Sequence, residues 1–336
     1  MNNRLPTIAT LGSHTALQIL KGAKDEGFGT LIVCVTERVG FYKRFSFIGE
    51  IVELKNYSNF SVVEKKLANH NVILIPHGSF VAYLGKEGNK NISIPYFGNK
   101  AVLDWEGNRV KQAKWLLNAS VPMPAQYTKT SKRFPVIVKS FGAAGGSGYF
   151  FAKDNREFQQ KFKIFKASEY VIQEYIVGVT MYFHYFYSPL TKKIELMSID
   201  RRYETNADAL GRIPQSAQQG LGLSPSYVVV GNSPLVVRES LLPEVYELGE
   251  RVVATSREII DGRGLFGPFC LETIITPDLR IYVMEISCRI VAGTNLFTHG
   301  SAYSYLIYDE PMSTGRRIAR EIKLAIKQKK LYRLLS

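Results

Sequence analysis

The chain has 336 residues, of which 46% are hydrophobic and 21% are charged, and its formal net charge is +14. This composition is typical of a folded globular protein, and the length allows two or three lobes around a large core. No apolar run approaches the roughly 20 residues that cross a bilayer, which argues against a membrane-spanning protein.

Two further features indicate the cellular compartment. The first residues, Met1-Asn2-Asn3-Arg4, lead directly into an apolar strand and do not resemble a signal peptide. The three cysteines, Cys34, Cys270 and Cys288, lie far apart in apolar segments without the spacing of a metal site. We therefore expect reduced core cysteines in a cytoplasmic protein.

Residues 7–75 alternate between apolar strands and amphipathic helices, the pattern of a parallel sheet covered on both faces. Ser13 is the expected N-cap of the first helix. The expected strands are residues 7–11, 31–35, 48–54 and 72–75, and the expected helices are residues 16–23 and 62–69.

Two polar loops follow strands of this expected sheet. Gly12-Ser13-His14 follows the first strand, and His77-Gly78-Ser79 follows the fourth. Open parallel sheets bind ligands at the carboxyl ends of their strands, and a helix N-terminus behind Ser13 suits a phosphate. Each histidine alone is equally compatible with a hydrogen-bonded loop residue, but the pairing of the two loops favours a ligand site.

A connector at residues 121–124 follows an expected helix at residues 110–117. We place the domain boundary there, between an N-terminal domain (1–120) and a second domain (121–336). The second domain is expected to have a small lobe at about 125–180 and a larger lobe at about 181–336. Its expected elements up to residue 199 are strands at 135–139, 149–151, 170–176, 181–187 and 193–199 and a basic helix at 156–166.

Lys139 stands at the end of an apolar strand and directly before a loop of glycines and small residues, 140–148. Glycines let backbone N–H groups turn toward an anion, and the lysine adds a point charge. The loop is not a Walker A motif, because no Lys-Ser/Thr pair follows the last glycine. A phosphate-binding loop and a glycine-rich hairpin without a ligand are both compatible with this segment alone.

The next segments are more polar. Residues 200–206 are dense in side chains that fix a polar ligand, and residues 207–225 are expected to form a flexible loop and a candidate lid. A strand at residues 227–230 then leads to Asn232, and a long amphipathic helix is expected at residues 243–260.

Glu272 and Glu285 each interrupt an apolar strand in an expected hairpin formed by residues 269–275 and 281–287. A buried carboxylate is costly unless it is paired or binds a cation. Two of them on neighbouring strands make an oxygen-rich site for Mg²⁺ or Mn²⁺. The alternative is a pair of salt-bridged carboxylates with Arg289 as partner to one of them.

Basic residues accumulate between residues 316 and 333, on an amphipathic helix. We interpret them as the solvated face of that helix, with nucleic-acid contact as the second interpretation. Because the chain has no interleaved basic and aromatic motif of the kind that binds single strands, we expect no nucleic-acid partner.

Lys139, the glycine loop, Glu174, Glu272 and Glu285 follow one another in an order that resembles the ATP-grasp superfamily. In that superfamily a strand lysine and a glycine-rich loop hold the ATP phosphates, a hinge like residues 173–177 recognises adenine, and two strand carboxylates chelate magnesium. The last motif is usually Glu-x-Asn-x-Arg, whereas residues 285–289 read Glu-Ile-Ser-Cys-Arg. The resemblance implies an α/β (α+β) ATP-grasp fold with an N-terminal, Rossmann-like parallel-sheet lobe. It also implies a ligase that activates a carboxylate as an acyl phosphate for attack by an amine.

Segments along nearly the whole chain resemble the archaeal formate-dependent synthetases of purine biosynthesis. These segments are residues 12–17, 76–80, 201–206, 238–243, 267–272, 290–295 and 313–322. That family formylates 5-aminoimidazole-4-carboxamide ribonucleotide (AICAR) with ATP and free formate, through formyl phosphate. Its members form trimers or hexamers, so the resemblance implies a homo-oligomer.

The resemblance implies a role for individual residues. AICAR contacts would come from His14, Ser79 and Asn232, the metal ligands would be Glu272 and Glu285, and Lys139 and Arg289 would be catalytic. ATP would be held by Lys139, Gly145, Gly146, Gly148, Glu174, Tyr175, Val177 and Glu204. Family members carry basic residues in the glycine loop where this chain has Ala144 and Ser147. The alternative is therefore an ATP-grasp ligase that acts on a different acid or amine.

Overall fold

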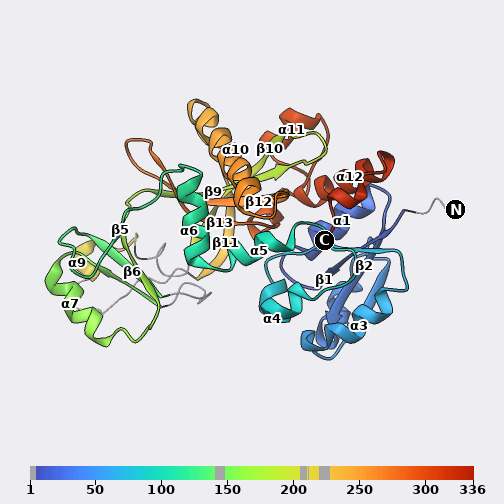
Figure 1. Ribbon diagram of the computed structural model, residues 1–336, viewed down its shortest axis with the longest axis horizontal. Coiled ribbons are helices and arrows are strands. Elements are labelled where there is room, and N and C mark those ends of the chain that lie inside the picture. The colour runs from blue at the N-terminus through green and yellow to red at the C-terminus, as the bar shows by residue number, and fades with distance from the viewer. Residues whose placement is uncertain (1–4, 141–147, 205–209, 211, 219–227) are drawn as a thin grey trace.

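The computed structural model describes residues 5–140, 148–204, 210, 212–218 and 228–336. Its strands form three sheets, which follow one another along the long axis of the molecule (Figure 1). The N-terminal sheet is parallel, and the central and small sheets are antiparallel. The expected mixture of a parallel N-terminal lobe and an α+β remainder is confirmed.

The N-terminal sheet has the order β3-β2-β1-β4. Its strands are β1 (Thr7–Leu11), β2 (Gly29–Val35), β3 (Glu50–Leu54) and β4 (Val72–Leu74). Side chains alternate across it: Leu31 and Val33 pack with α3 (Phe60–Leu67) and α4 (Phe80–Lys90). Ile32 and Cys34 pack on the opposite face with α1 (Ala16–Asp25) and α2 (Thr36–Tyr42). This double cover explains why the strands are apolar on both faces.

The expected N-cap of α1 is wrong. Thr15 precedes the helix, and no side chain caps its first turn. The hydroxyl of Ser13 lies instead 3.3 Å from that of Ser79, beyond β4. Ser13 therefore joins the two loops rather than capping the helix.

Two helices connect this lobe to the rest of the chain, α5 (Lys100–Glu106) and α6 (Arg109–Asn118). Gln112 Nε2 donates to the carbonyl oxygen of Ile286 at 3.0 Å. The indole of the buried Trp115 donates to the carbonyl oxygen of Val252 at 2.9 Å. These bonds fix α6 against the central sheet and its covering helix.

The small sheet has the order β5-β8-β6-β7. Its strands are β5 (Gln126–Tyr127), β6 (Val136–Ser140), β7 (Tyr149–Ala152) and β8 (Tyr170–Glu174). The helix α7 (Asn155–Ile164) covers it, with Phe158 buried in a separate apolar cluster. The small lobe therefore has a core of its own.

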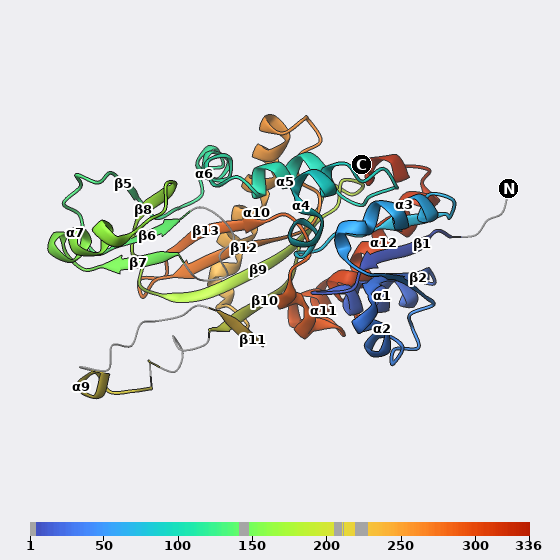
Figure 2. The same cartoon turned by 90° about the horizontal axis from the view of Figure 1, so that it is seen from below.

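The central sheet has the order β11-β10-β9-β12-β13, and Figure 2 shows these strands side by side. They are β9 (Val179–Tyr187), β10 (Ile194–Glu204), β11 (Val229–Pro234), β12 (Gly267–Ile275) and β13 (Ile281–Ser287). β10 continues through the polar segment that we expected to follow it, because Asp200 to Glu204 pair with β11. Most of the expected loop 207–225 lies outside the described residues, and α9 (Gln215–Gln218) lies within it.

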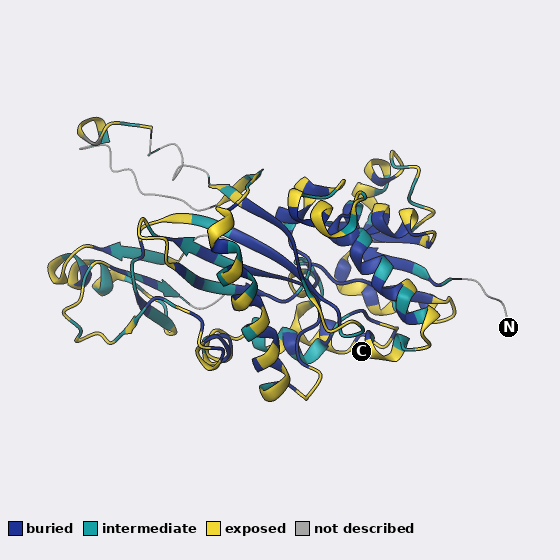
Figure 3. Ribbon diagram, turned by 90° about the horizontal axis from the view of Figure 1, so that it is seen from above, coloured by how far each residue is buried: buried dark blue, intermediate teal, exposed yellow. Residues whose placement is uncertain are grey.

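The other described helices of the larger lobe are η2 (Glu239–Leu241), α10 (Leu242–Ile259), η3 (Ala292–Phe297), α11 (Ala302–Tyr308), α12 (Thr314–Lys327) and η4 (Leu331–Arg333). α12 returns to the N-terminal lobe and crosses α1 where Gly22 meets Gly315. A Cβ at either glycine would lie 2.2–2.3 Å from backbone atoms of the other helix. One apolar cluster consequently runs from β1 through α12 into the central sheet. Figure 3 shows buried residues in the strands of both the N-terminal lobe and the central sheet.

The interpretation of the C-terminal basic residues as a solvated face is wrong for the first turns of α12. Arg317 is buried, with its guanidinium group between Glu195 and Glu321. Arg316 and Arg320 both pair with Glu26 at the end of α1. Part of the positive charge of this helix is therefore neutralised within the fold.

Cys34, Cys270 and Cys288 are free and buried, as expected. Within the described ranges, no helix is both long enough and apolar enough to cross a membrane.

Candidate active site

A cavity of about 1030 Å³ lies between the small lobe and the central sheet. Both walls carry residues that the sequence singled out. The predicted ATP and metal residues that line it are Lys139, Gly148, Glu174, Tyr175, Val177, Glu204, Glu272 and Glu285. Gly145 and Gly146, with Ala144 and Ser147, lie outside the described residues. The fold thus brings together side chains that are up to 146 positions apart, Lys139 and Glu285.

The two strand carboxylates are direct neighbours across the β12–β13 hairpin, where Glu272 pairs with Glu285. Each carboxylate forms an ion pair with an arginine. Arg109 Nη1 lies 2.6 Å from Glu285 Oε2, and the guanidinium group of Arg202 donates to both oxygens of Glu272, at 3.0 and 3.3 Å. The alternative of two salt-bridged carboxylates is therefore what the structure contains, but the expected partner is wrong, because Arg289 pairs with Glu106 at 2.9 Å.

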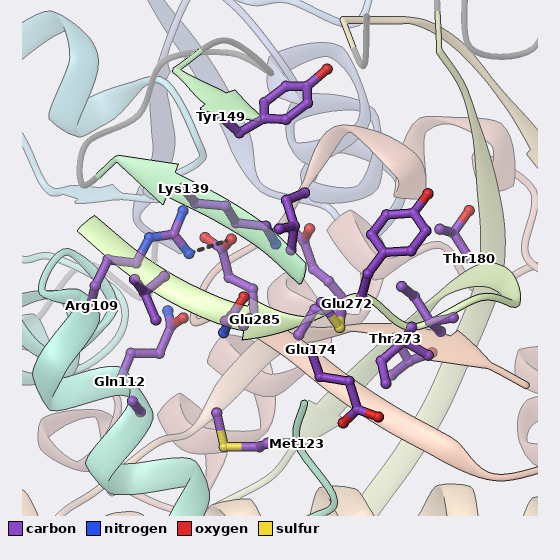
Figure 4. Close-up of a pocket in the computed structure, with 18 of the residues that line it drawn as sticks. Arg109, Gln112, Met123, Lys139, Tyr149, Glu174, Thr180, Glu272, Thr273 and Glu285 are labelled. Carbon is purple, nitrogen blue, oxygen red and sulfur yellow. Dashed lines mark ion pairs between the residues drawn. The ribbon is translucent and has the colours of Figure 1, made fainter. Parts of the chain in front are cut away.

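Burial and the neighbouring carboxylate raise the pKa of Glu285, while Arg109 opposes the shift. Lys139 extends toward this pair (Figure 4), and burial together with Arg109 lowers the pKa of its ammonium group. Charged groups of both signs are thus packed together at one wall of the cavity. Such crowding of titratable groups in a cavity is typical of functional sites.

The carboxylate oxygens of Glu272 and Glu285 fit a divalent cation that also binds the phosphate oxygens of a ligand. Among the described residues, no group of three or more His, Cys, Asp or Glu side chains gathers as a metal cage. Mg²⁺ is commonly held by only one or two carboxylates, with phosphate oxygens and water completing its six ligands. Glu272 and Glu285 supply two such carboxylates at one wall of the cavity.

The predicted adenine hinge lies at the end of β8, at the junction of the two lobes. The backbone N–H of Glu174 donates to the carbonyl oxygen of Ala125 at 2.8 Å. The ring of Tyr175 packs edge-on against Phe151, with 4.8 Å between the ring centroids. Val177 is exposed at the cavity wall. An apolar wall beside backbone polar groups suits a flat heterocycle.

The two predicted N-terminal loops meet outside this cavity. The rings of His14 and His77 are stacked, with 5.5 Å between their centroids and 3° between their planes. Gly78 lies against the His14 ring, because a Cβ there would be 2.6 Å from Nε2. The His14 side chain is exposed at one edge, but desolvation by the surrounding chain and the positive charges of His77, Arg289 and Arg202 lower its pKa to about 3. Both histidines are therefore neutral near pH 7.

The buried His77 is a pH-dependent element of the fold. Its Nε2 lies 2.9 Å from the carbonyl oxygen of Leu11. Burial is the largest effect on its pKa and, with Arg289, lowers it to about 4, against the opposing hydrogen bond with Leu11. Between about pH 6.5 and pH 4 the unfolded chain therefore binds a proton here that the folded chain does not, and stability falls as pH falls.

We expect this histidine to cost about 2 kcal/mol of unfolding free energy at pH 5 relative to pH 7. Urea unfolding at both pH values measures the loss. The variant His77→Gln, which keeps an amide donor for Leu11, should lose about 2 kcal/mol less than wild type, and His70→Gln on the surface should behave like wild type. An equal loss in all three proteins would contradict the assignment.

Asn232 does not line the cavity that holds the ATP and metal residues. It lies on β11, and its Nδ2 donates to Asp200 Oδ2 at 2.6 Å. The strand pairing places it beside Arg202, which is the partner of Glu272. Asn232 therefore lies on the side of the central sheet that connects the carboxylate pair with the histidine loops.

Some residues of the site were not predicted from the sequence. Arg109 is the first residue of α6 and Glu106 the last of α5, and nothing in their spacing indicates partners near residues 285 and 289. Tyr83, whose hydroxyl donates to Ser13 at 2.8 Å, lies on α4, a helix that we did not expect. Only Arg202 had a signal, because it belongs to the polar segment 200–206.

Comparisons with known proteins decide the family. Two family models match, a protein of unknown function (DUF1246) at residues 8–127 and a domain of unknown function (DUF1297) at residues 151–336. The chain is 52% identical, over 332 residues, to a protein of Pyrococcus horikoshii named 5-formaminoimidazole-4-carboxamide-1-(beta)-D-ribofuranosyl 5'-monophosphate synthetase. The match covers 96% of this chain and 98% of that protein. The chain belongs to this synthetase family.

Solved structures agree with this synthetase family. The crystal structure of the IMP biosynthesis protein PurP from Thermococcus kodakaraensis has a TM-score of 0.80 and 32% identity, and covers 98% of this chain and 100% of that one. N5-carboxyaminoimidazole synthetase from Staphylococcus aureus, complexed with ADP, has a TM-score of 0.62 and 15% identity, over 87% and 72% of the two chains. The second likeness concerns the fold alone, and the expected ATP-grasp fold is confirmed.

Proposed function

We propose that this protein is an ATP- and formate-dependent ligase that formylates AICAR to 5-formaminoimidazole-4-carboxamide ribonucleotide in purine biosynthesis. A formate oxygen attacks the γ-phosphorus of ATP, which releases ADP and gives formyl phosphate. The amine of AICAR then attacks the formyl carbon, and phosphate leaves. The observation that carries the proposal is a lysine and a cross-strand carboxylate pair in one cavity, in a chain that is 52% identical to a named synthetase.

The cavity residues receive their roles from this proposal. Lys139 would face the phosphates, and Gly145, Gly146 and Gly148 of the glycine loop would contact them. The adenine base lies against the hinge residues Glu174, Tyr175 and Val177, and Glu204 completes the ATP site. A cation near the transferring phosphoryl group is required because the transition state spreads negative charge over its oxygens.

Glu272 and Glu285 would hold Mg²⁺ or Mn²⁺ between them and the ATP phosphates. When bound, the metal withdraws charge from the phosphoryl oxygens as a Lewis acid. Glu285 would be available to the cation only without its ion pair to Arg109, whereas Arg202 is also held by the Tyr182 ring, 3.7 Å from its centroid. Arg289 is held by an ion pair with Glu106, and its positive charge lies close enough to His77 to lower the pKa of that histidine.

The acceptor nucleotide would occupy the cleft at the histidine loops, in contact with His14, Ser79 and Asn232. A neutral imidazole suits this site, because it donates to or accepts from the base without competing for the amine proton. Ser13, Ser79 and Tyr83 supply hydroxyl groups on the same side, joined by the bonds of 3.3 and 2.8 Å.

We also propose the organisation of the whole molecule. Residues 1–120 would form the acceptor domain and residues 121–336 the ATP-grasp domain, whose small lobe (about 125–180) has its own apolar cluster. We expect a cytoplasmic homo-oligomer, a trimer or hexamer, and exposed apolar side chains on α11 (Tyr305, Leu306 and Ile307) are compatible with a subunit contact.

The test is ADP release by purified protein with ATP, Mg²⁺ and AICAR, with formate present or omitted. The proposal predicts ADP release only with both co-substrates, and one formylated nucleotide per ADP. A panel of other small acids and nucleotide amines runs alongside. ADP release that needs a different acid or amine, and not formate and AICAR, would overturn the proposal.

The acceptor assignment of His14 has its own prediction. His14→Ala should raise the KM for AICAR about tenfold, the value of a lost hydrogen bond, and leave the KM for ATP within about twofold. Steady-state kinetics with each substrate varied in turn measures both constants, and His70→Ala on the surface is the control. An equal rise in both constants would mean that His14 does not contact the acceptor.

A further inference from the structure

Asp200 is a completely buried carboxylate in β10, without a role in the reaction described above. Its Oδ1 lies 2.5 Å from Nε2 of His184 in β9, and its Oδ2 accepts from Asn232. His184 is 1% exposed, and its Nδ1 has no partner in the described part of the chain. Burying such a pair in a strand-rich core is costly, so the arrangement calls for a reason other than stability.

The contact with Asp200 fixes the orientation of the Asn232 side chain. A carboxylate only accepts hydrogen bonds, so the amide must present its NH₂ group to Asp200 and its oxygen elsewhere. Asn232 is partly exposed, and no donor from the described residues reaches its Oδ1. Within the described part of the chain, this oxygen is therefore an acceptor whose hydrogen-bonding capacity is not used.

Asp200 also contacts the segment that approaches His14. A Cβ at Gly293 would lie 2.3 Å from Asp200 Oδ1, so only glycine lets η3 pack this closely on the carboxylate. Two residues later, Asn295 Nδ2 donates to the carbonyl oxygen of His14 at 3.0 Å. Asp200 thus lies where the segments that carry Asn232 and His14 meet.

We propose that Asp200, held by His184, is a positioning residue that directs the Asn232 oxygen toward the acceptor, so that this position recognises an N–H donor of the aminoimidazole base. The inference rests on the proposed function, because it takes Asn232 to contact AICAR. It predicts selection for a base that donates at this position. A group that only accepts, such as a carboxylate, would face the Asn232 oxygen and be rejected.

Exchange of the two side chains tests the inference. In Asn232→Asp, two carboxylates face each other and AICAR binding should weaken at least about 100-fold, as expected when a hydrogen bond to a charged group is lost and repulsion is added. Asp200→Asn frees the amide of Asn232 to rotate and should weaken binding about tenfold.

The double variant, Asp200→Asn with Asn232→Asp, restores the pairing with its direction reversed. The amide introduced at position 200 accepts from His184 and donates to the carboxylate introduced at position 232. The second oxygen of that carboxylate still accepts from the base. Binding should therefore return to within about tenfold of wild type.

Isothermal titration with AICAR measures the affinity of each variant, and titration with ADP measures the neighbouring site. ADP affinity should stay within about twofold throughout. Ser198→Ala is the matched control, since Ser198 is a buried polar residue on the same strand whose hydroxyl has no partner in the described chain. Thermal unfolding shows whether each variant is folded.

The outcomes distinguish failure of the positioning role from failure of the acceptor assignment. If wild type binds AICAR and the double variant binds no better than Asn232→Asp, the positioning role is wrong and the proposed function stands. If Asp200→Asn does not fold, comparison of Asn232→Asp with the double variant still decides. If wild type binds ADP but no AICAR, the acceptor assignment fails and the inference with it.

Discussion

Glu285→Gln is expected to lower kcat/KM for formate-dependent ADP release by at least about 1,000-fold. Loss of a metal ligand removes several kcal/mol of charge stabilisation in the transition state, and each 1.36 kcal/mol is a factor of ten in rate. Glutamine keeps the shape of the side chain and removes a charge that burial and Glu272 make costly. The fold should therefore remain intact, with an unchanged unfolding midpoint.

Two measurements make this result specific to the metal. Titration with Mn²⁺ and ADP should show weaker joint binding in Glu285→Gln, whereas ADP alone should bind as in wild type. Glu250→Gln, an exposed position on α10, should match wild type in every assay. Turnover within about tenfold of wild type at ordinary magnesium would show that Glu285 does not carry the cation.

Arg317→Met is expected to lower the unfolding free energy by about 3–5 kcal/mol, the range for removing one partner of a buried ion pair. Arg317 donates to both oxygens of Glu195, at 2.7 and 3.0 Å, and to Glu321 at 2.8 Å. Methionine fills part of the volume over the Phe186 ring but leaves two buried carboxylates without a cation. Since Arg317 and Glu321 lie on α12 and Glu195 lies on β10, the packing of α12 against the central sheet should weaken.

Urea unfolding at pH 7 measures this effect. Arg320→Met, one turn further along α12, is the control, because Glu26 keeps its contact with Arg316. Arg320 itself is partly exposed, and the buried Glu26 keeps the cations of Arg316 and Lys323, so the loss should cost no more than about 1 kcal/mol. Similar destabilisation by both substitutions would contradict the distinction between the fully buried Arg317 and the partly exposed Arg320.

Local pattern was sufficient for most of the fold. Apolar runs and turns predicted β1, β2, the β12–β13 hairpin and α10 to within a few residues, because burial on one or both faces leaves a clear period in the sequence. The docking of α12 onto α1 was not predictable in this way. It depends on Gly22 and Gly315 meeting across almost the whole chain, and a glycine carries no sign of the partner it will approach.

In the site, too, some residues were predictable from local sequence pattern and others depend on the tertiary fold. Glu272 and Glu285 were recognisable because each breaks an apolar strand, and the hairpin then makes them neighbours. The arginines that pair with them come from a helix start (Arg109) and from a different strand (Arg202), so only the tertiary fold reveals these two ion pairs. Asp200 was visible as part of a polar segment, but its bond to Asn232 depends on the register of β10 and β11.

The most direct test of formate activation as formyl phosphate follows the oxygen atoms of formate. The protein is supplied with formate labelled with heavy oxygen, ATP, Mg²⁺ and AICAR, and the released phosphate is analysed by mass spectrometry. Carboxylate activation places the bridging oxygen of formyl phosphate in the phosphate that the amine expels. The proposed mechanism predicts one labelled oxygen in each phosphate formed, with an equal amount of formylated nucleotide. Unlabelled phosphate, or label without formylated nucleotide, would contradict it.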